Sequence, residues 1–199
     1  MSDGRIDGEL SKLWRIGPAR TEDFDFVFRG VDPLGTYWDR DAYYPDWVPS
    51  SGERPFDPIG AKYTFREKPK RKKIPTFPET IVPITCPKSI FEEFFSELLT
   101  NDVVVRPCTI DGTAYVQIVV TTVIDLIDME RSLFRRNSAH QIYRFNRIVL
   151  RRPSSVLPPI FLCGSENCLR NDPIVDHRFH DIVKVNRFTG LAFTEVDVL

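Results

Sequence analysis

The chain of 199 residues is 42% apolar and 28% charged, and its formal net charge is -1. This composition is close to the average for soluble globular domains, so it argues against a disordered chain and against a membrane protein. The small net charge gives no overall field that would indicate nucleic acid or anionic lipid as the partner. Residues 1–14 lack the apolar stretch of a secretory signal, so we expect a cytoplasmic protein with no membrane partner.

Residues 21–57 are acidic and aromatic, with nine carboxylates against three arginines and a local net charge of -6. Within them, residues 35–47 follow neither the two-residue nor the 3.6-residue apolar period, which predicts irregular structure held by aromatic rings. Residues 62–73 reverse the sign, with seven basic residues against Glu67. We therefore predict an irregular, aromatic and acidic N-terminal portion, residues 1–75, that ends in a basic connector.

A helix and a hairpin are predicted next. The apolar residues of 89–100 recur about every four positions and leave three glutamates outward, which predicts a helix with Ser89 as its N-cap. Residues 103–108 and 114–122 are β-branched runs separated by Asp111 and Gly112. An Asp-Gly pair readily supplies the positive φ of a tight turn, so these runs predict a β-hairpin.

The remaining segments complete a fold of the α+β class. Residues 125–136 fit either a short helix or a turn followed by a strand, and periodicity leaves both open. Residues 140–151 and 160–163 indicate strands, residues 176–186 indicate a helix, and Gly190 precedes a closing strand. The regular alternation of a parallel doubly wound sheet is missing. We therefore predict a mixed or antiparallel sheet with a few short helices over residues 76–199, in one compact unit with residues 1–75.

Four cysteines are too few for a disulfide framework in a chain of this length, so we expect reduced thiols. Cys163, Cys168, His177 and His180 contain the ligand types of a tetrahedral zinc site. Their spacing differs from that of familiar zinc fingers, so we expect two buried thiols and two half-exposed helical histidines instead. We predict no metal and no cofactor.

The sequence contains no catalytic motif. Both Gly-x-Ser-x-Gly and the glycine-rich phosphate loops are absent, and Ser138 and His140 are only sequence neighbours. Asp125 and Asp128 would share a face in a helix, yet such pairs are usually solvated or capping residues. We therefore predict a protein that is not an enzyme.

Basic residues gather at residues 68–73 and again between Arg131 and Arg152, where no acidic residue intervenes. With Tyr143 and Phe145 available for stacking, the second cluster offers a nucleic-acid hypothesis. The acidic N-terminal third would repel a polyanion, so this is the alternative. The second cluster comprises Arg131, Arg135, Arg136, Arg144, Arg147, Arg151 and Arg152.

The aromatic acidic segment is the better candidate for an interface. Tyrosine and tryptophan give large contact areas for little loss of entropy, and aspartates would meet a basic partner. In the competing interpretation, Trp38 and Trp47 are core anchors of an irregular lobe. The predicted partner-binding residues are Trp38, Asp39, Asp41, Tyr43, Tyr44, Asp46 and Trp47.

Four stretches of the C-terminal half carry a resemblance: VIDLIDMERS at 123–132, IFLC at 160–163, RFHDI at 178–182 and FTGLAFTEV at 188–196. From about Val116 to its end, the chain resembles family eleven of the immunity proteins of polymorphic toxin systems. Members of that family resemble small cytoplasmic antidotes to bacterial toxins that are delivered by type VI secretion or contact-dependent inhibition. The resemblance implies a protein that binds and neutralises a cognate toxin domain, and it transfers no functional residue. The toxin's chemistry and the oligomeric state stay open.

Overall fold

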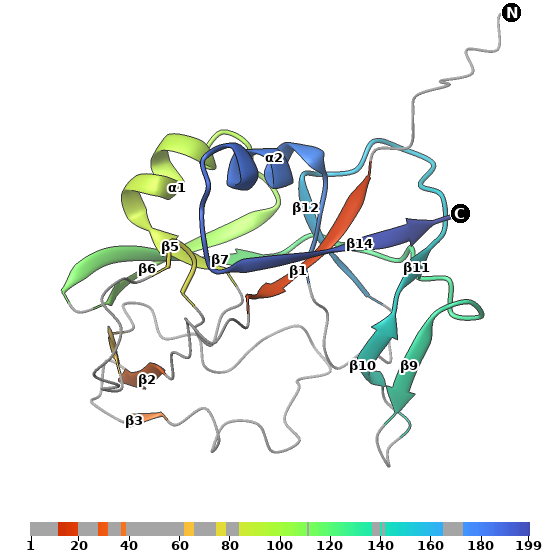
Figure 1. Cartoon of the computed structure of the whole chain (residues 1–199), viewed down its shortest axis with the longest axis horizontal. Coiled ribbons are helices and arrows are strands. Elements are labelled where there is room, and N and C mark those ends of the chain that lie inside the picture. The colour runs from red at the N-terminus through yellow and green to blue at the C-terminus, as the bar shows by residue number, and fades with distance from the viewer. Residues whose placement is uncertain are drawn as a thin grey trace, which may run out of the picture.

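A computed structural model describes residues 12–19, 28–31, 37–38, 62–65, 75–78, 84–110, 112–136, 140, 142–164 and 173–199. Within these residues strands predominate, and there are two short helices, α1 (Lys88–Phe94) and α2 (His177–Val185) (Figure 1). The strands form two six-stranded sheets and a two-stranded ribbon. The predicted α+β class, with mixed sheets and few helices, is therefore confirmed. No helix among these residues is both long enough and apolar enough to cross a membrane.

The first sheet is mixed, and β1 lies near its centre. Across the sheet the order is β11 (Val149–Leu150), β14 (Leu191–Val198), β1 (Leu13–Pro18), β13 (Pro173–Val175), β12 (Ile160–Cys163) and β8 (Val123–Ile124). β1 is antiparallel to both of its neighbours, so Trp14 lies opposite Glu195 on β14 and Val175 on β13. The pairs of β11 with β14 and of β8 with β12 are parallel.

The second sheet contains the predicted hairpin. Its order is β3 (Tyr37–Trp38), β2 (Phe28–Val31), β4 (Lys62–Phe65), β6 (Val103–Ile110), β7 (Thr113–Val120) and β5 (Thr85–Pro87). β6 and β7 pair along their whole length, and Gly112 adopts a φ of 77° in the turn between them. This pairing confirms the predicted hairpin. Glycine suits the turn because it adopts a positive φ without steric cost.

Strands on both sides of residue 75 share hydrogen bonds. Residues 62–65, expected to begin a basic connector, form the strand β4, which pairs in parallel with β6. β1 likewise joins strands from the C-terminal portion. β2 and β3 are short strands within the portion predicted to be irregular, and most of that portion lies outside the described residues. The division of the chain at residue 75 stays a prediction.

The helix predicted at residues 89–100 exists but is shorter. Its apolar face is confirmed, since Phe95 and Leu99 are buried and Glu92 is exposed. α1 ends at Phe94, and just beyond it the Ser96 hydroxyl donates to the Glu92 carbonyl over 2.8 Å, a contact that slightly destabilises a helix. The Ser96 N–H bonds to the Phe91 carbonyl instead. The Ser89 N-cap prediction is wrong, because Pro87 occupies the N-cap position, with no side-chain hydrogen bond.

The later segments follow the sequence closely. Residues 125–136 take the second alternative, a turn followed by the strand β9 (Leu133–Arg136), which pairs with β10 (Ile142–Arg147). The strand predicted at 160–163 is confirmed as β12, whereas the single strand predicted at 140–151 is divided into β10 of the ribbon and β11 of the first sheet. α2 matches the predicted helix, and the Asp176 carboxylate caps it by accepting the N–H groups of Arg178 and Phe179. Gly190 precedes β14 with a φ of 102°.

Two hydrophobic clusters lie on opposite faces of the first sheet. Ile16 of β1 faces a cluster that includes Phe95 and Phe179 and joins both sheets to the two helices. Leu13 of the same strand faces a second cluster that contains Phe145 of β10. Figure 1 accordingly shows α1 and α2 on one side of the sheets and the β9–β10 ribbon on the other. The sheet is therefore covered on both faces, as the alternation along β1 requires.

Candidate protein-binding site

Of the seven predicted partner-binding residues, Trp38 alone lies within the described residues. It belongs to β3, where it lies opposite Gly30 of β2. β3 is the outermost described strand of the second sheet, so the predicted segment follows directly on a sheet edge. The other six residues, Asp39, Asp41, Tyr43, Tyr44, Asp46 and Trp47, lie outside the described residues. Their role stays a prediction.

Among the suggested metal ligands, Cys163 and His180 are engaged in the fold, and His177 is exposed at the start of α2. Cys163 is buried in the second hydrophobic cluster, and Cys168 lies outside the described residues. The His180 ring stacks on Trp14, with 4.0 Å between the ring centroids and an interplanar angle of 7°, and its Nδ1 lies 2.9 Å from Asp181 Oδ1. Within the part of the chain that the structure describes, no three His, Cys, Asp or Glu side chains are grouped so as to hold a metal.

The thiols of Cys86 and Cys108 are buried and unpaired by disulfides. Burial, with a smaller contribution from the neighbouring Cys108, raises the pKa of Cys86 to about 12. Burial likewise raises the pKa of Cys108 to about 11. Because the thiolate is the nucleophile, both groups are poor nucleophiles at neutral pH.

Asp125 and Asp128 form ion pairs with different arginines. Asp125 pairs with Arg151 over 3.1 Å. Asp128 pairs with Arg131 over 2.8 Å and accepts the N–H groups of Glu130 and Arg131 in the turn before β9. The hydrogen bond from the Arg131 side chain lowers the pKa of Asp128. These contacts match the capping interpretation rather than an acid–base pair.

The β9–β10 ribbon is the clearest candidate surface among the described residues, and we call it the arginine ribbon. It lies apart from α1 and α2 (Figure 1). Its inner face is anchored by Phe134 and Phe145, whose rings meet edge to face at 5.9 Å. Outward, Leu133 is 59% exposed, and Arg135 and Arg136 are also exposed. The ribbon therefore combines an exposed apolar side chain with cations on a fixed backbone.

Part of the predicted basic cluster is neutralised. Arg131 and Arg151 form the ion pairs described above, and Arg147 forms a third, with Asp197, at 2.5 Å. Arg136 lies over the Phe134 ring at 4.9 Å. Arg135 and Arg152 form no ion pair with any carboxylate of the described residues. The side chains of Tyr143 and Arg144, and residues 68–73, lie outside the described part.

The sequence does not single out Leu133 as an interface residue, because residues 125–136 fit both a short helix and a turn followed by a strand. Once 133–136 is a strand, alternation points Leu133 away from the face that Phe134 occupies. The signal was therefore present in the sequence, but it depended on the assignment of the strand.

A scan against models of known protein families finds no match for this chain, and a search of curated proteins finds no relative.

Proposed function

We propose that this protein is an immunity protein that binds a cognate bacterial toxin and neutralises it through a protein–protein interface. The resemblance of residues 116–199 to an immunity family suggests the class. The observation that carries the proposal is the arginine ribbon, which presents exposed Leu133 beside exposed Arg135. Apolar and arginine anchors of this kind dominate the energetics of protein interfaces.

The contacts of the potentially reactive groups support a binding role. Of the described residues in the sequence-predicted reactive set, Asp128 caps a turn, Cys163 is buried and His180 stacks on Trp14, whereas His177 is exposed. These interactions stabilise the fold and hold the outer surface in shape. An inhibitor needs such a preorganised surface, because less entropy is then lost on binding.

The proposal names two candidate surfaces for contact with the toxin. Residues 38–47 form the acidic aromatic segment predicted from sequence, and the arginine ribbon is the cationic surface among the described residues. The proposal assigns aromatic anchoring to the first surface and charge complementarity with acidic groups of the toxin to the second.

The test is co-production with each protein encoded beside the gene, read as restored growth in cells that make the toxin and as a complex on size-exclusion chromatography. We expect Trp38→Ala and Leu133→Asp to weaken the complex, each by roughly tenfold or more. Val185→Asp is the matched control, because Val185 is 79% exposed on α2, away from the arginine ribbon. Absence of any complex and of any growth rescue would contradict the proposal.

One observation favours a second function, nucleic-acid binding. A two-stranded ribbon fits the DNA major groove, and the arginine ribbon has this form. Such binding weakens steeply with salt, with a log–log slope of about -0.9 per phosphate contacted. Fluorescence anisotropy with a duplex DNA probe, at rising salt, separates the two functions. A steep slope that becomes shallower by about 0.9 in Arg135→Gln would favour this second function over toxin binding.

A further inference from the structure

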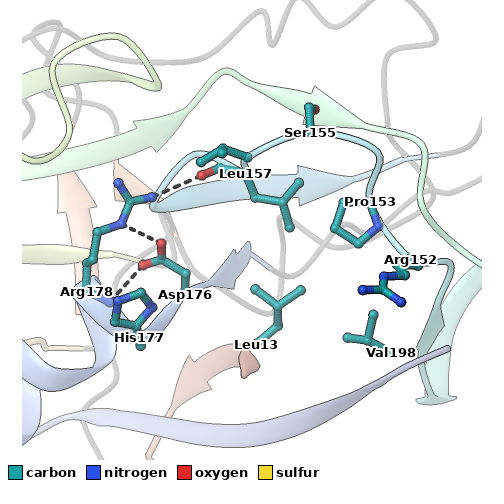
Figure 2. Close-up of a pocket in the computed structure, with 10 residues that line it drawn as sticks. Leu13, Arg152, Pro153, Ser155, Leu157, Asp176, His177, Arg178 and Val198 are labelled. Carbon is teal, nitrogen blue, oxygen red and sulfur yellow. Dashed lines mark hydrogen bonds and ion pairs between the residues drawn. The ribbon is translucent and has the colours of Figure 1, made fainter. Parts of the chain in front are cut away.

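The described part contains a surface pocket beside the start of α2 (Figure 2). Residues from four separate parts of the chain line it: the start of β1, the end of β14, residues 152–157 between β11 and β12, and residues 176–178. Its volume is about 390 Å³, toward the lower end of the roughly 300–1,000 Å³ typical of small-molecule sites.

One wall of the pocket is held by hydrogen bonds. Arg178 Nε donates to Asp176 Oδ2 over 2.6 Å, and Arg178 Nη2 donates to the Leu157 carbonyl over 3.0 Å (Figure 2). The Asp176 side chain is only 7% exposed, and its other oxygen caps α2. These bonds fasten the segment before β12 to the start of the helix, so the wall is preformed.

The middle of the pocket is apolar. Figure 2 shows Leu13 and Leu157 between the ion pair at one end and Arg152 at the other, with Val198 beside Arg152. Leu13 is buried and the other two are half-buried. An apolar ligand body placed here would cover surface that water now reaches, and that burial favours binding.

The charge of the pocket is positive. Asp176 is the single carboxylate that lines it, and Arg178 neutralises that charge at 2.6 Å. Arg152 is exposed, lies at the opposite end, and pairs with no carboxylate of the described residues. One unneutralised guanidinium beside an apolar middle suits a ligand with one negative charge and an apolar body.

We propose that this pocket binds a small carboxylic acid, with its carboxylate at Arg152 and its apolar body over Leu13, Leu157 and Val198. A guanidinium matches a carboxylate in a bidentate geometry, and a single cation favours a monoanion over a phosphate dianion. The lining residues are not part of the arginine ribbon, and the proposal does not depend on toxin binding.

The test uses hexanoate as the probe and hexanol as its uncharged counterpart, followed by NMR of the leucine and valine methyl groups of the full chain. We expect hexanoate to shift the methyl signals of Leu13, Leu157 and Val198, with a dissociation constant on the order of 1 mM. Arg152→Gln should weaken hexanoate about three- to tenfold and leave hexanol unchanged. Arg187→Gln, at an exposed arginine that does not line the pocket, is the matched control and should change neither.

A second arm compares the peptides acetyl-Val-Leu-Glu-amide and acetyl-Val-Leu-Gln-amide, to separate a free acid from an acidic segment of a partner. Shifts with hexanoate that depend on Arg152 support the proposal. It is overturned if hexanoate leaves the three methyl signals unmoved, if Arg152→Gln binds hexanoate as the unmodified protein does, or if the glutamate peptide alone binds.

Discussion

Gly190 lies where the chain turns from α2 into β14, and two features there require glycine. Its φ is 102°, and a Cβ at this position would lie 2.0 Å from the Phe77 carbonyl oxygen. We expect Gly190→Ala to lower the free energy of unfolding by roughly 2–4 kcal/mol, because strain and overlap add. Chemical denaturation measures this loss.

Two other glycines provide the controls for that measurement. Gly112 also has a positive φ, of 77°, but a Cβ would meet nothing within 4 Å, so Gly112→Ala should cost only about 1 kcal/mol. Gly17 has open space and no positive φ, and Gly17→Ala should change stability by less than about 0.5 kcal/mol. Equal losses at all three positions would show that the contact with Phe77 is unimportant.

The buried thiols give a prediction about pH. Because folding raises the pKa of Cys86 and Cys108 above the ordinary 9.0, the folded state keeps these protons longer than the unfolded state does. Their contribution to stability is therefore complete below pH 9.0 and is lost as the pH rises toward 11 and 12. We expect melting temperatures to fall over this alkaline range, and Cys86→Val to flatten the fall. A melting temperature that stays constant across the range would contradict the burial of these thiols.

At the scale of single elements, α2 depends on its cap. Asp176 accepts two helix N–H groups and also holds Arg178. We expect Asp176→Ala to lower the free energy of unfolding by about 2 kcal/mol, since both the cap and the arginine's partner are lost. Asp176→Asn keeps a capping oxygen, so it should recover about half of that loss. Denaturation curves in which the two variants match would contradict a capping role.

Elements with strong local signals could be predicted from the sequence, and elements that depend on distant partners could not. The Asp-Gly pair in the sequence predicts the β6–β7 hairpin, and the helix predicted at residues 176–186 corresponds to α2. β4 was missed because its four residues become a strand only by pairing with β2 and β6, far along the chain. The early end of α1 could not be predicted, because the apolar period continues past Phe94 to Leu99 and does not reveal the hydrogen bond of the Ser96 hydroxyl.

The candidate site was less predictable than the fold. The basic cluster was visible in sequence, but which arginines are neutralised depends on partners such as Asp197, fifty positions from Arg147. The exposure of Leu133 can be inferred from the sequence only if residues 133–136 are known to form the strand β9. Apolar periodicity identifies the side chains that are buried. It does not show which of the exposed side chains bind a partner, so a binding surface is hard to predict from sequence patterns alone.

At the scale of the whole molecule, the two sheets, the helices and the arginine ribbon form a preorganised exterior. One cluster joins both sheets to α1 and α2, and the other fixes the ribbon against the opposite face of β1. A change in either cluster therefore alters the outer surface as well as stability, and interface variants should be confined to exposed residues such as Leu133.

The most direct test is a titration of the toxin that we propose is encoded beside this gene with the purified protein, reading toxin activity. The account predicts that inhibition is complete near equimolar protein, and that Leu133→Asp shifts the titration about tenfold while Val185→Asp does not. Toxin activity that persists in large excess of the protein would contradict it.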